Sequence, residues 1–257
     1  MPPTFSEAQI LATVAGFSWV LVRISALFVA MPVFAGHLVP APVRVLLSLA
    51  TSFLIWPILP AAPAVELFSL AGFLIDIQQF LIGLAMGFIL QLAFAAIVFG
   101  GQSVAYAMGL GFASMVDPTT GIQVPVIAQF YQMLSILLFL TLDGHLLIIQ
   151  LLVESFRTFP VGQFAPSQTA LWDIVLWMGK VFAAGLLLSL PVVTALLIVN
   201  LGFGIATRAA PQLNIFSVGL PVSLLLGTLL MDLTLPDVLQ LFSSFLDAAY
   251  QLIMRLF

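Results

Sequence analysis

Two charged side chains interrupt long apolar stretches of this sequence, where charge is costly. Arg23 lies in a run that begins near Ile10, and Asp76 lies in a run that begins near Leu67. An arginine or aspartate near the centre of a membrane helix costs about 2.5–3.5 kcal/mol on insertion scales. We therefore expect both side chains to face protein or water. They could form an ion pair or line a conduction path, or they could belong to a buried packing pair or lie nearer the membrane interface.

The segment Asp143-Gly144-His145 is the one place where a carboxylate and an imidazole are close in sequence. A proton relay is one hypothesis, because histidine titrates near neutrality and Asp/His chains carry protons in some transporters. The alternative, which we favour, is a helix break at which Asp143 caps the following turn. A zinc site is not expected, since His37 is the only other histidine and the chain has no cysteine.

The overall composition indicates a membrane protein. Hydrophobic residues make up 63% of the 257 residues and charged residues 6%, against about 45–50% and about 25% in soluble domains. There is no basic run to bind nucleic acid. The sequence also lacks the Gly-x-Ser-x-Gly, P-loop, His-Glu-x-x-His and dinucleotide-binding patterns of common enzyme classes. We therefore expect a membrane protein that is not an enzyme and has no cofactor.

About six apolar segments reach the length of roughly 20 residues that a spanning helix needs, and some are considerably longer. They are Ile10–Ala35, Val43–Pro60, Leu67–Gly101, Val126–Val153, Ala170–Ile205 and Leu213–Leu235. Strands of a barrel would be short and alternating instead. The sequence thus predicts an all-α polytopic membrane protein of about six long, partly broken helices.

Glycine and proline positions refine this prediction. Four glycines are plausible break points in the overlong third segment, and Pro191 is expected to kink or split the fifth. These glycines are Gly83, Gly87, Gly100 and Gly101. Gly83 and Gly87 also form a Gly-x-x-x-Gly pattern, which predicts a close helix contact, either within the chain or with a partner subunit.

The final stretch, Pro236–Phe257, carries one narrow polar stripe. Its polar residues recur at steps of three and four, as on one face of a helix. They are Asp237, Gln240, Ser244, Asp247, Gln251 and Arg255. Such a helix fits a membrane interface or a protein partner better than lipid on all sides.

The stretch Ser103–Gly121 is rich in glycine and mildly apolar, so it resembles neither a helix nor a soluble loop. Irregular backbone at membrane depth is tolerated only where protein buries it or where it lines a cavity. The bulky residues Phe112, Met115 and Val116 could close a pore by excluding water. The segment could equally be an ordinary loop between helices.

Five stretches, in this order along the chain, resemble the FliR family of flagellar export-gate proteins, whose counterpart in virulence secretion systems is SctT. They are Val39–Ala50, Gln78–Phe88, Gly109–Pro118, Phe139–His145 and Arg208–Phe216. Each stretch alone is weakly specific, but the ordered set is highly specific and extends over nearly the whole chain. In detail, these stretches resemble the flagellar members of the family more than the virulence-system members.

The resemblance implies a fold and a plug. FliR-like proteins fold like a FliP subunit fused to a FliQ-like hairpin. This implies a FliP-like portion at 1–168 and a FliQ-like hairpin with an amphipathic final helix at 169–257. In this family the glycine-rich loop, here 106–121, is the plug of the closed gate. The plug residues implied are Gly109, Gly111, Phe112, Met115, Val116, Asp117 and Pro118.

The resemblance also explains the overlong segments as bent hairpins packed against neighbouring subunits. Polar and small residues of the third segment are then expected at subunit interfaces, and polar residues near position 210 in a hairpin turn. The interface set is Asp76, Gln78, Gln79, Gly83, Gly87 and Gln91, and the turn set is Arg208, Pro211, Gln212 and Asn214.

The function implied is that of a gate subunit in the flagellar basal body. We expect a protein of the bacterial inner membrane that forms and gates the channel for unfolded flagellar subunits. The partners implied are FliP-like and FliQ-like subunits in a helical hetero-oligomer, FlhB-like and FlhA-like proteins, the unfolded substrates and membrane lipid. The alternative from the residues alone is a small-solute or proton-coupled transporter, which the charges Arg23, Asp76, Asp143 and His145 and the broken helices would suit.

Overall fold

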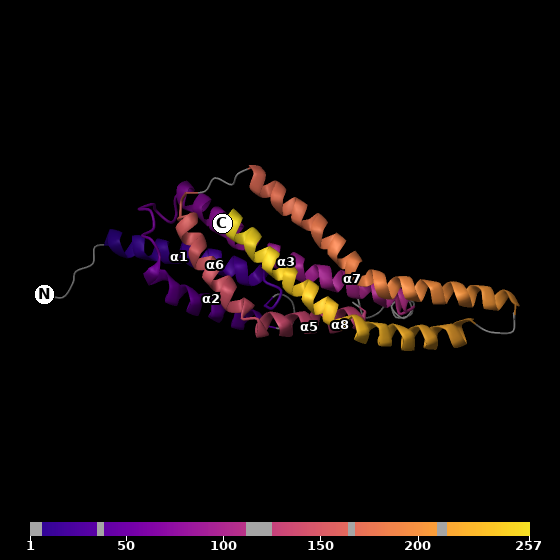
Figure 1. Ribbon diagram of the computed structural model, residues 1–257. Helices are drawn as coiled ribbons and strands as arrows, with labels where there is room; N and C mark the ends of the chain where they lie inside the picture. The colour runs from indigo at the N-terminus through magenta and orange to yellow at the C-terminus, as the bar shows by residue number, and fades with distance from the viewer. Residues whose placement is uncertain (1–6, 35–38, 112–124, 164–167, 210–214) are drawn as a thin grey trace. The chain divides into compact units, whose positions relative to one another are not determined.

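The computed structural model describes residues 7–34, 39–111, 125–163, 168–209 and 215–257 (Figure 1). All regular elements within these residues are helices. They are α1 (Glu7–Ala30), α2 (Ala41–Ile55), the short 3-10 helix η1 (Trp56–Ile58), α3 (Leu70–Ala107), α5 (Val126–Thr141), α6 (Gly144–Thr158), α7 (Gln168–Ala209) and α8 (Ile215–Leu256). The prediction of an all-α protein is confirmed.

Several of these helices have the length and composition to cross a membrane. Five candidate spans are present among the described residues, or six if α5 and α6 together count as one broken span. α3 has 38 residues, and α7 and α8 have 42 each. At 1.5 Å per residue they are about 57 and 63 Å long, roughly twice the thickness of the hydrocarbon core. The prediction of about six apolar helical segments is therefore confirmed, and the three longest helices exceed what a single bilayer crossing needs.

The breaks predicted at the glycines of α3 do not occur. α3 runs without interruption from Leu70 to Ala107, so the prediction that the chain is no longer helical from Ser103 onward is wrong for 103–107. Pro191 lies inside α7 without splitting it. A glycine in a helix costs only about 1 kcal/mol relative to alanine, which close packing at that position offsets. Proline is tolerated in membrane helices because neighbouring groups satisfy the freed backbone carbonyls.

The chain folds into two compact units. Unit 1 comprises 1–91, 143–175 and 247–257, and unit 2 comprises 92–142 and 176–246. The division into a FliP-like portion at 1–168 and a FliQ-like portion at 169–257 concerns likeness to other subunits, and it stays a prediction.

The core of unit 1 is formed by one face each of α1, α3 and α6. Its nearly fully buried side chains include Trp19, Ile24, Leu27, Ile82, Met86, Ile148, Leu152 and Phe156. In lipid, helices associate through van der Waals contact and hydrogen bonds, because lipid tails are as apolar as the side chains. The closeness of the fit therefore matters more here than the area that is buried.

Aromatic rings and glycines pack the core of unit 2. The ring of Phe94 on α3 meets Phe139 of α5 and Phe242 of α8 edge-on, at centroid distances of 5.6 and 5.0 Å. A Cβ at Gly100 would lie 2.7 Å from Cδ2 of Leu188 on α7, and one at Gly101 would lie 2.9 Å from Cα of Ala128 on α5. The glycines at which we predicted breaks are thus points of close helix contact.

The polar stripe on α8 is confirmed. Its six members, Asp237, Gln240, Ser244, Asp247, Gln251 and Arg255, are all exposed. Val238, Phe242, Leu246, Ala249 and Ile253, which alternate with them, are buried. Before Pro236 most large exposed side chains of α8 are apolar, among them Leu225, Leu229 and Leu233, and Asp232 is the exposed charged residue there. The exposed surface of α8 therefore changes from apolar to polar near Pro236.

Candidate functional site

The guanidinium of Arg23 is the centre of a buried polar cluster in unit 1. The side chain is fully buried. Its Nε donates a hydrogen bond of 2.7 Å to Oε1 of Gln79 on α3. One terminal nitrogen donates to the carbonyl oxygen and to Oγ of Ser155 on α6, at 2.9 and 3.1 Å, and the other donates to the carbonyl oxygen of Phe159 at 2.9 Å. The guanidinium carbon also lies 3.9 Å from the centroid of the Phe156 ring.

This cluster contains no carboxylate among the described residues. The acceptors are an amide, a hydroxyl and two main-chain carbonyls, and both carbonyls belong to the end of α6. The C-terminal end of a helix carries partial negative charge and unpaired carbonyls, which a cation stabilises. Arg23 therefore caps α6 from outside the helix and ties α1, α3 and α6 together.

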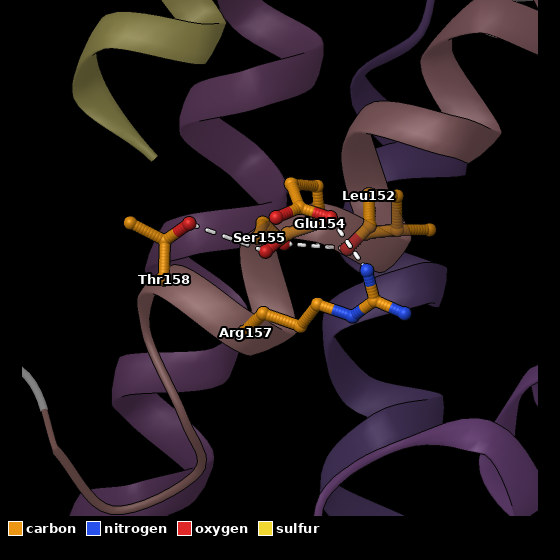
Figure 2. A network of polar contacts seen from close by, with 5 residues as sticks. All are labelled: Leu152, Glu154, Ser155, Arg157 and Thr158. Carbon is orange, nitrogen blue, oxygen red and sulfur yellow. Dashed lines mark hydrogen bonds and ion pairs between the residues drawn. The ribbon is translucent and has the colours of Figure 1, made fainter.

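Figure 2 shows the last turns of α6, which position these acceptors. Oγ of Ser155 donates to the carbonyl oxygen of Leu152 at 2.7 Å, which leaves its lone pairs free to accept from Arg23. On the exposed side of the helix, Arg157 forms a 3.1 Å ion pair with Glu154, and Thr158 donates to the carbonyl oxygen of Glu154. Exposed pairs contribute only about 0–1 kcal/mol. The two arginines near this helix end thus have different roles, and only Arg23 joins helices.

The Gly-x-x-x-Gly pattern makes its close contact within the chain. A Cβ at Gly83 would overlap the carbonyl oxygen of Arg23, and one at Gly87 would lie 2.6 Å from Cβ of Ala30. Both positions let α3 approach the backbone of α1. This approach brings Gln79, one turn before Gly83, within hydrogen-bonding distance of Arg23.

The other residues predicted at subunit interfaces differ in exposure. Asp76 and Gln78 are half-buried, Gln79 is buried and Gln91 is exposed. Oε1 of Gln78 and Nε2 of Gln79 are buried without a hydrogen-bond partner in the described part of the chain. Asp76 lines a depression with residues of α1 and of the turn before α3, and the described residues contain no ion pair between Arg23 and Asp76. The interface role of the whole set stays a prediction.

The predicted plug loop begins at a well-defined helix end in unit 2. α3 ends at Ala107, and Gly109 has a positive φ of 83°. The N–H of Gly109 donates to the carbonyl of Tyr106, and the N–H of Leu110 donates to that of Ala105. This pair of bonds is the Schellman motif, in which glycine takes the left-handed position.

Contacts with α8 support the start of this loop. A Cβ at Gly109 would lie 2.9 Å from Cδ1 of Leu220, and one at Gly227 would lie 2.6 Å from Cγ of Met108. The residues Phe112, Met115, Val116, Asp117 and Pro118 lie outside the described residues, so of the plug set the structure describes Gly109 and Gly111.

The predicted helix break at Asp143 is present, but its geometry differs from the prediction. Asp143 precedes α6 and adopts left-handed backbone angles, with φ 53° and ψ 25°. Its carbonyl accepts hydrogen bonds from the N–H groups of Leu146 and Leu147. The side chain makes no capping hydrogen bond, so the expected side-chain cap is wrong. An N-cap side chain accepts a hydrogen bond from the first turn of the helix when its own backbone is extended. The left-handed backbone of Asp143 does not place the carboxylate in that position.

His145 is half-buried, and its Nδ1 has no hydrogen-bond partner in the described part of the chain. No group of three His, Asp or Glu side chains that could hold a metal is found among the described residues. In the predicted hairpin turn, Arg208 is exposed in the last turn of α7. Pro211, Gln212 and Asn214 lie outside the described residues.

Sequence reasoning identified Arg23 and Gln79 separately but missed the bond between them and the other acceptors of Arg23. Ser155 and Phe159 accept through main-chain carbonyls. Every residue has such a carbonyl, so residue type alone could not predict these acceptors. The Ser155 hydroxyl, which is buried on α6, was the one available signal.

Comparison with known proteins identifies the family. The family described as bacterial export proteins, family 1, matches residues 14–249. The flagellar biosynthetic protein FliR of Pectobacterium carotovorum is 42% identical over 233 residues, which cover 91% of this chain and 89% of that protein. FliR of Escherichia coli K12 is 40% identical, with 86% of this chain and 84% of that protein covered. FliR of Bacillus subtilis is 32% identical, with 81% of each covered. Together with the helical, membrane-spanning fold, these matches show that the chain belongs to the FliR family of bacterial export proteins.

Proposed function

We propose that this chain is a membrane-embedded subunit of the flagellar protein export apparatus, and that it forms and gates part of the channel for unfolded flagellar subunits. The observation that carries the proposal is the similarity to proteins named flagellar biosynthetic protein FliR across most of the chain. The apolar helices are consistent with it, because a channel subunit must present apolar surface to lipid or to other subunits. We propose that the chain resides in the bacterial inner membrane.

The gating element that we propose is the loop 106–121. Its entry is held by the Schellman motif at Gly109 and by the contacts of Met108 and Gly109 with α8. A loop anchored in this way can change its conformation without disturbing the end of α3. The bulky apolar residues Phe112, Met115 and Val116 would then close the pore by excluding water.

The role is proposed to be structural and non-catalytic, within a hetero-oligomer. FliP-like and FliQ-like subunits, FlhB-like and FlhA-like proteins, unfolded substrates and lipid are the proposed partners. The half-buried side chain of Gln78, whose Oε1 has no hydrogen-bond partner among the described residues, supports a polar contact at this position of α3. We propose that Arg208, Pro211, Gln212 and Asn214 form the polar turn of the FliQ-like hairpin.

The transporter alternative receives no support from the comparisons. Arg23, one of the charges that motivated it, is committed to protein acceptors.

Purification from native membranes tests the proposal. A tagged full-length chain is expected to restore swimming in a strain that lacks the corresponding gene, and to co-purify stoichiometrically with other flagellar export subunits. A chain that purifies alone as a homo-oligomer and binds a small solute would contradict the proposal and favour transport.

A further inference from the structure

A depression in unit 1 surrounds a single carboxylate with apolar walls. It has a volume of about 540 Å³, and its lining includes Val22 of α1, Phe68 of the preceding turn, and Phe73 and Asp76 of α3. Phe68 is 96% exposed although it lines the depression. An aromatic side chain so exposed is available to a molecule that enters.

The polar groups of the depression do not satisfy Asp76. Oγ of Ser18 donates its hydrogen to the carbonyl oxygen of Ala15 at 2.8 Å. Oγ of Ser69 donates to the carbonyl oxygen of Glu66 at 2.6 Å and accepts from the N–H of Gly72 at 3.1 Å. Both hydroxyl protons in the lining are thus engaged elsewhere, and Asp76 gains no hydrogen bond from them.

The cations of the chain do not neutralise Asp76 either. The sequence has six Lys and Arg residues in all, and each lies in the described part of the chain. Arg157 pairs with Glu154, and Arg255 pairs with Asp173 at 2.6 Å. Arg23 is bound to its cluster. The remaining three, Arg44, Lys180 and Arg208, form no ion pair among the described residues.

We propose that this depression receives a lysine or arginine side chain of a partner subunit, which pairs with Asp76. Long cationic side chains combine an apolar stem with a charged head, and the depression offers apolar walls around one carboxylate. A free metal cation fits less well, because it needs several oxygen ligands and the hydroxyls here are engaged. The inference rests on the proposed function, since it requires assembly with other subunits, and it gives the predicted interface residue Asp76 a specific partner chemistry.

Photo-crosslinking in the intact complex tests the position of the partner. A photoreactive benzoyl-phenylalanine replaces Phe68 in the full-length chain, and the complex is irradiated in native membranes before purification. We expect a crosslink to another export subunit, at a peptide that contains a lysine or arginine. Crosslinks only to lipid, or only to peptides without a basic residue, would overturn the proposal.

Charge variants test the pairing itself. Asp76→Asn is expected to lower the yield of co-purified export subunits by about tenfold or more, as expected for the loss of a desolvated charge pair. Glu66→Gln is the matched control, because Glu66 is an exposed acid close in sequence that does not line the depression, and it should leave the yield unchanged. Asp76→Lys should be more harmful than Asp76→Asn. An acidic residue at the crosslinked basic position of the partner should then restore the complex, which a folding defect at position 76 would not allow.

The proposed function and the pairing at Asp76 are contradicted by different results. If the unaltered chain co-purifies with no export subunit, the proposed function fails. If the unaltered chain co-purifies with export subunits and Asp76→Asn does so equally well, only the pairing at Asp76 fails.

Discussion

Nε of Arg23 on α1 donates a 2.7 Å hydrogen bond to Oε1 of Gln79 on α3, and the same guanidinium holds the end of α6 through Ser155 and Phe159. Three helices that are far apart in sequence thus meet at one buried cation. The hydrogen bonds compensate the charge without a carboxylate, and the end of α6 adds its partial negative charge. We therefore regard this cluster as the main polar support of unit 1.

Arg23→Met should destabilise the protein by about 2–4 kcal/mol, because it leaves buried acceptors on Gln79, Ser155 and Phe159 without donors. Thermal unfolding of the purified protein or complex in detergent measures the effect. Arg157→Met is the control, since its exposed pair with Glu154 is worth about 0–1 kcal/mol. Equal effects of the two substitutions would contradict the role assigned to Arg23.

Gly83→Ala should weaken the packing of α1 on α3, because the added methyl group overlaps the carbonyl oxygen of Arg23. Overpacking of this kind costs about 1–3 kcal/mol. Gly202→Ala on α7 is the matched control: no atom lies within 4 Å of its added Cβ, and alanine gains up to about 1 kcal/mol in a helix. The amount of folded protein in the membrane and its melting temperature should fall for the first substitution and hold or rise for the second.

Asp143→Val should destabilise the break between α5 and α6 by about 1–2 kcal/mol, since a β-branched residue is strained at a φ of 53°. Asp143→Gly should be neutral or slightly stabilising, because glycine adopts these angles freely. Thermal unfolding distinguishes the two substitutions, and a tolerated valine would show that the left-handed backbone is not required.

The double substitution Asp143→Asn with His145→Ala should leave flagellar export largely intact, because the side chain of Asp143 makes no capping bond and its backbone defines the turn. Swimming motility and secreted flagellin measure the outcome. Loss of export from a normally assembled complex would instead support a proton relay.

Deletion of residues 111–116 should loosen the proposed seal while the complex still assembles, because the Schellman motif at Gly109 lies outside the deletion. Ion conductance of membranes that contain the assembled complex should rise. Unchanged conductance with normal assembly would argue against a plug at this loop.

The sequence predicted those features that depend on local pattern. Hydrophobic length identified the helices, and steps of three and four identified the exposed stripe from Asp237 to Arg255 on α8. The break at Asp143 was also found, because Asp-Gly is a local signal for left-handed or turn backbone.

Features that depend on neighbours far away in sequence were not predicted correctly. Gly100 and Gly101 were expected to break α3. Instead, their lack of a side chain lets Leu188 of α7 and Ala128 of α5 pack closely against α3. The acceptors of Arg23 are main-chain carbonyls 132 and 136 residues away, and their position follows only from the packing of α6. The side chain of Asp143 was predicted wrongly for a different, local reason, because the left-handed backbone of the turn decides its orientation.

The order in which the chain is made gives the Arg23 cluster a consequence for biogenesis. Ser155 follows Arg23 by 132 residues, which takes about 7–26 s to synthesise at roughly 5–20 residues per second. During that interval the guanidinium lacks its acceptors on α6, and on its own it resists entry into lipid. The guanidinium of Arg23 therefore reaches its final hydrogen-bonded state only after α6 has been made, so the packing of α1, α3 and α6 against one another is completed late in synthesis.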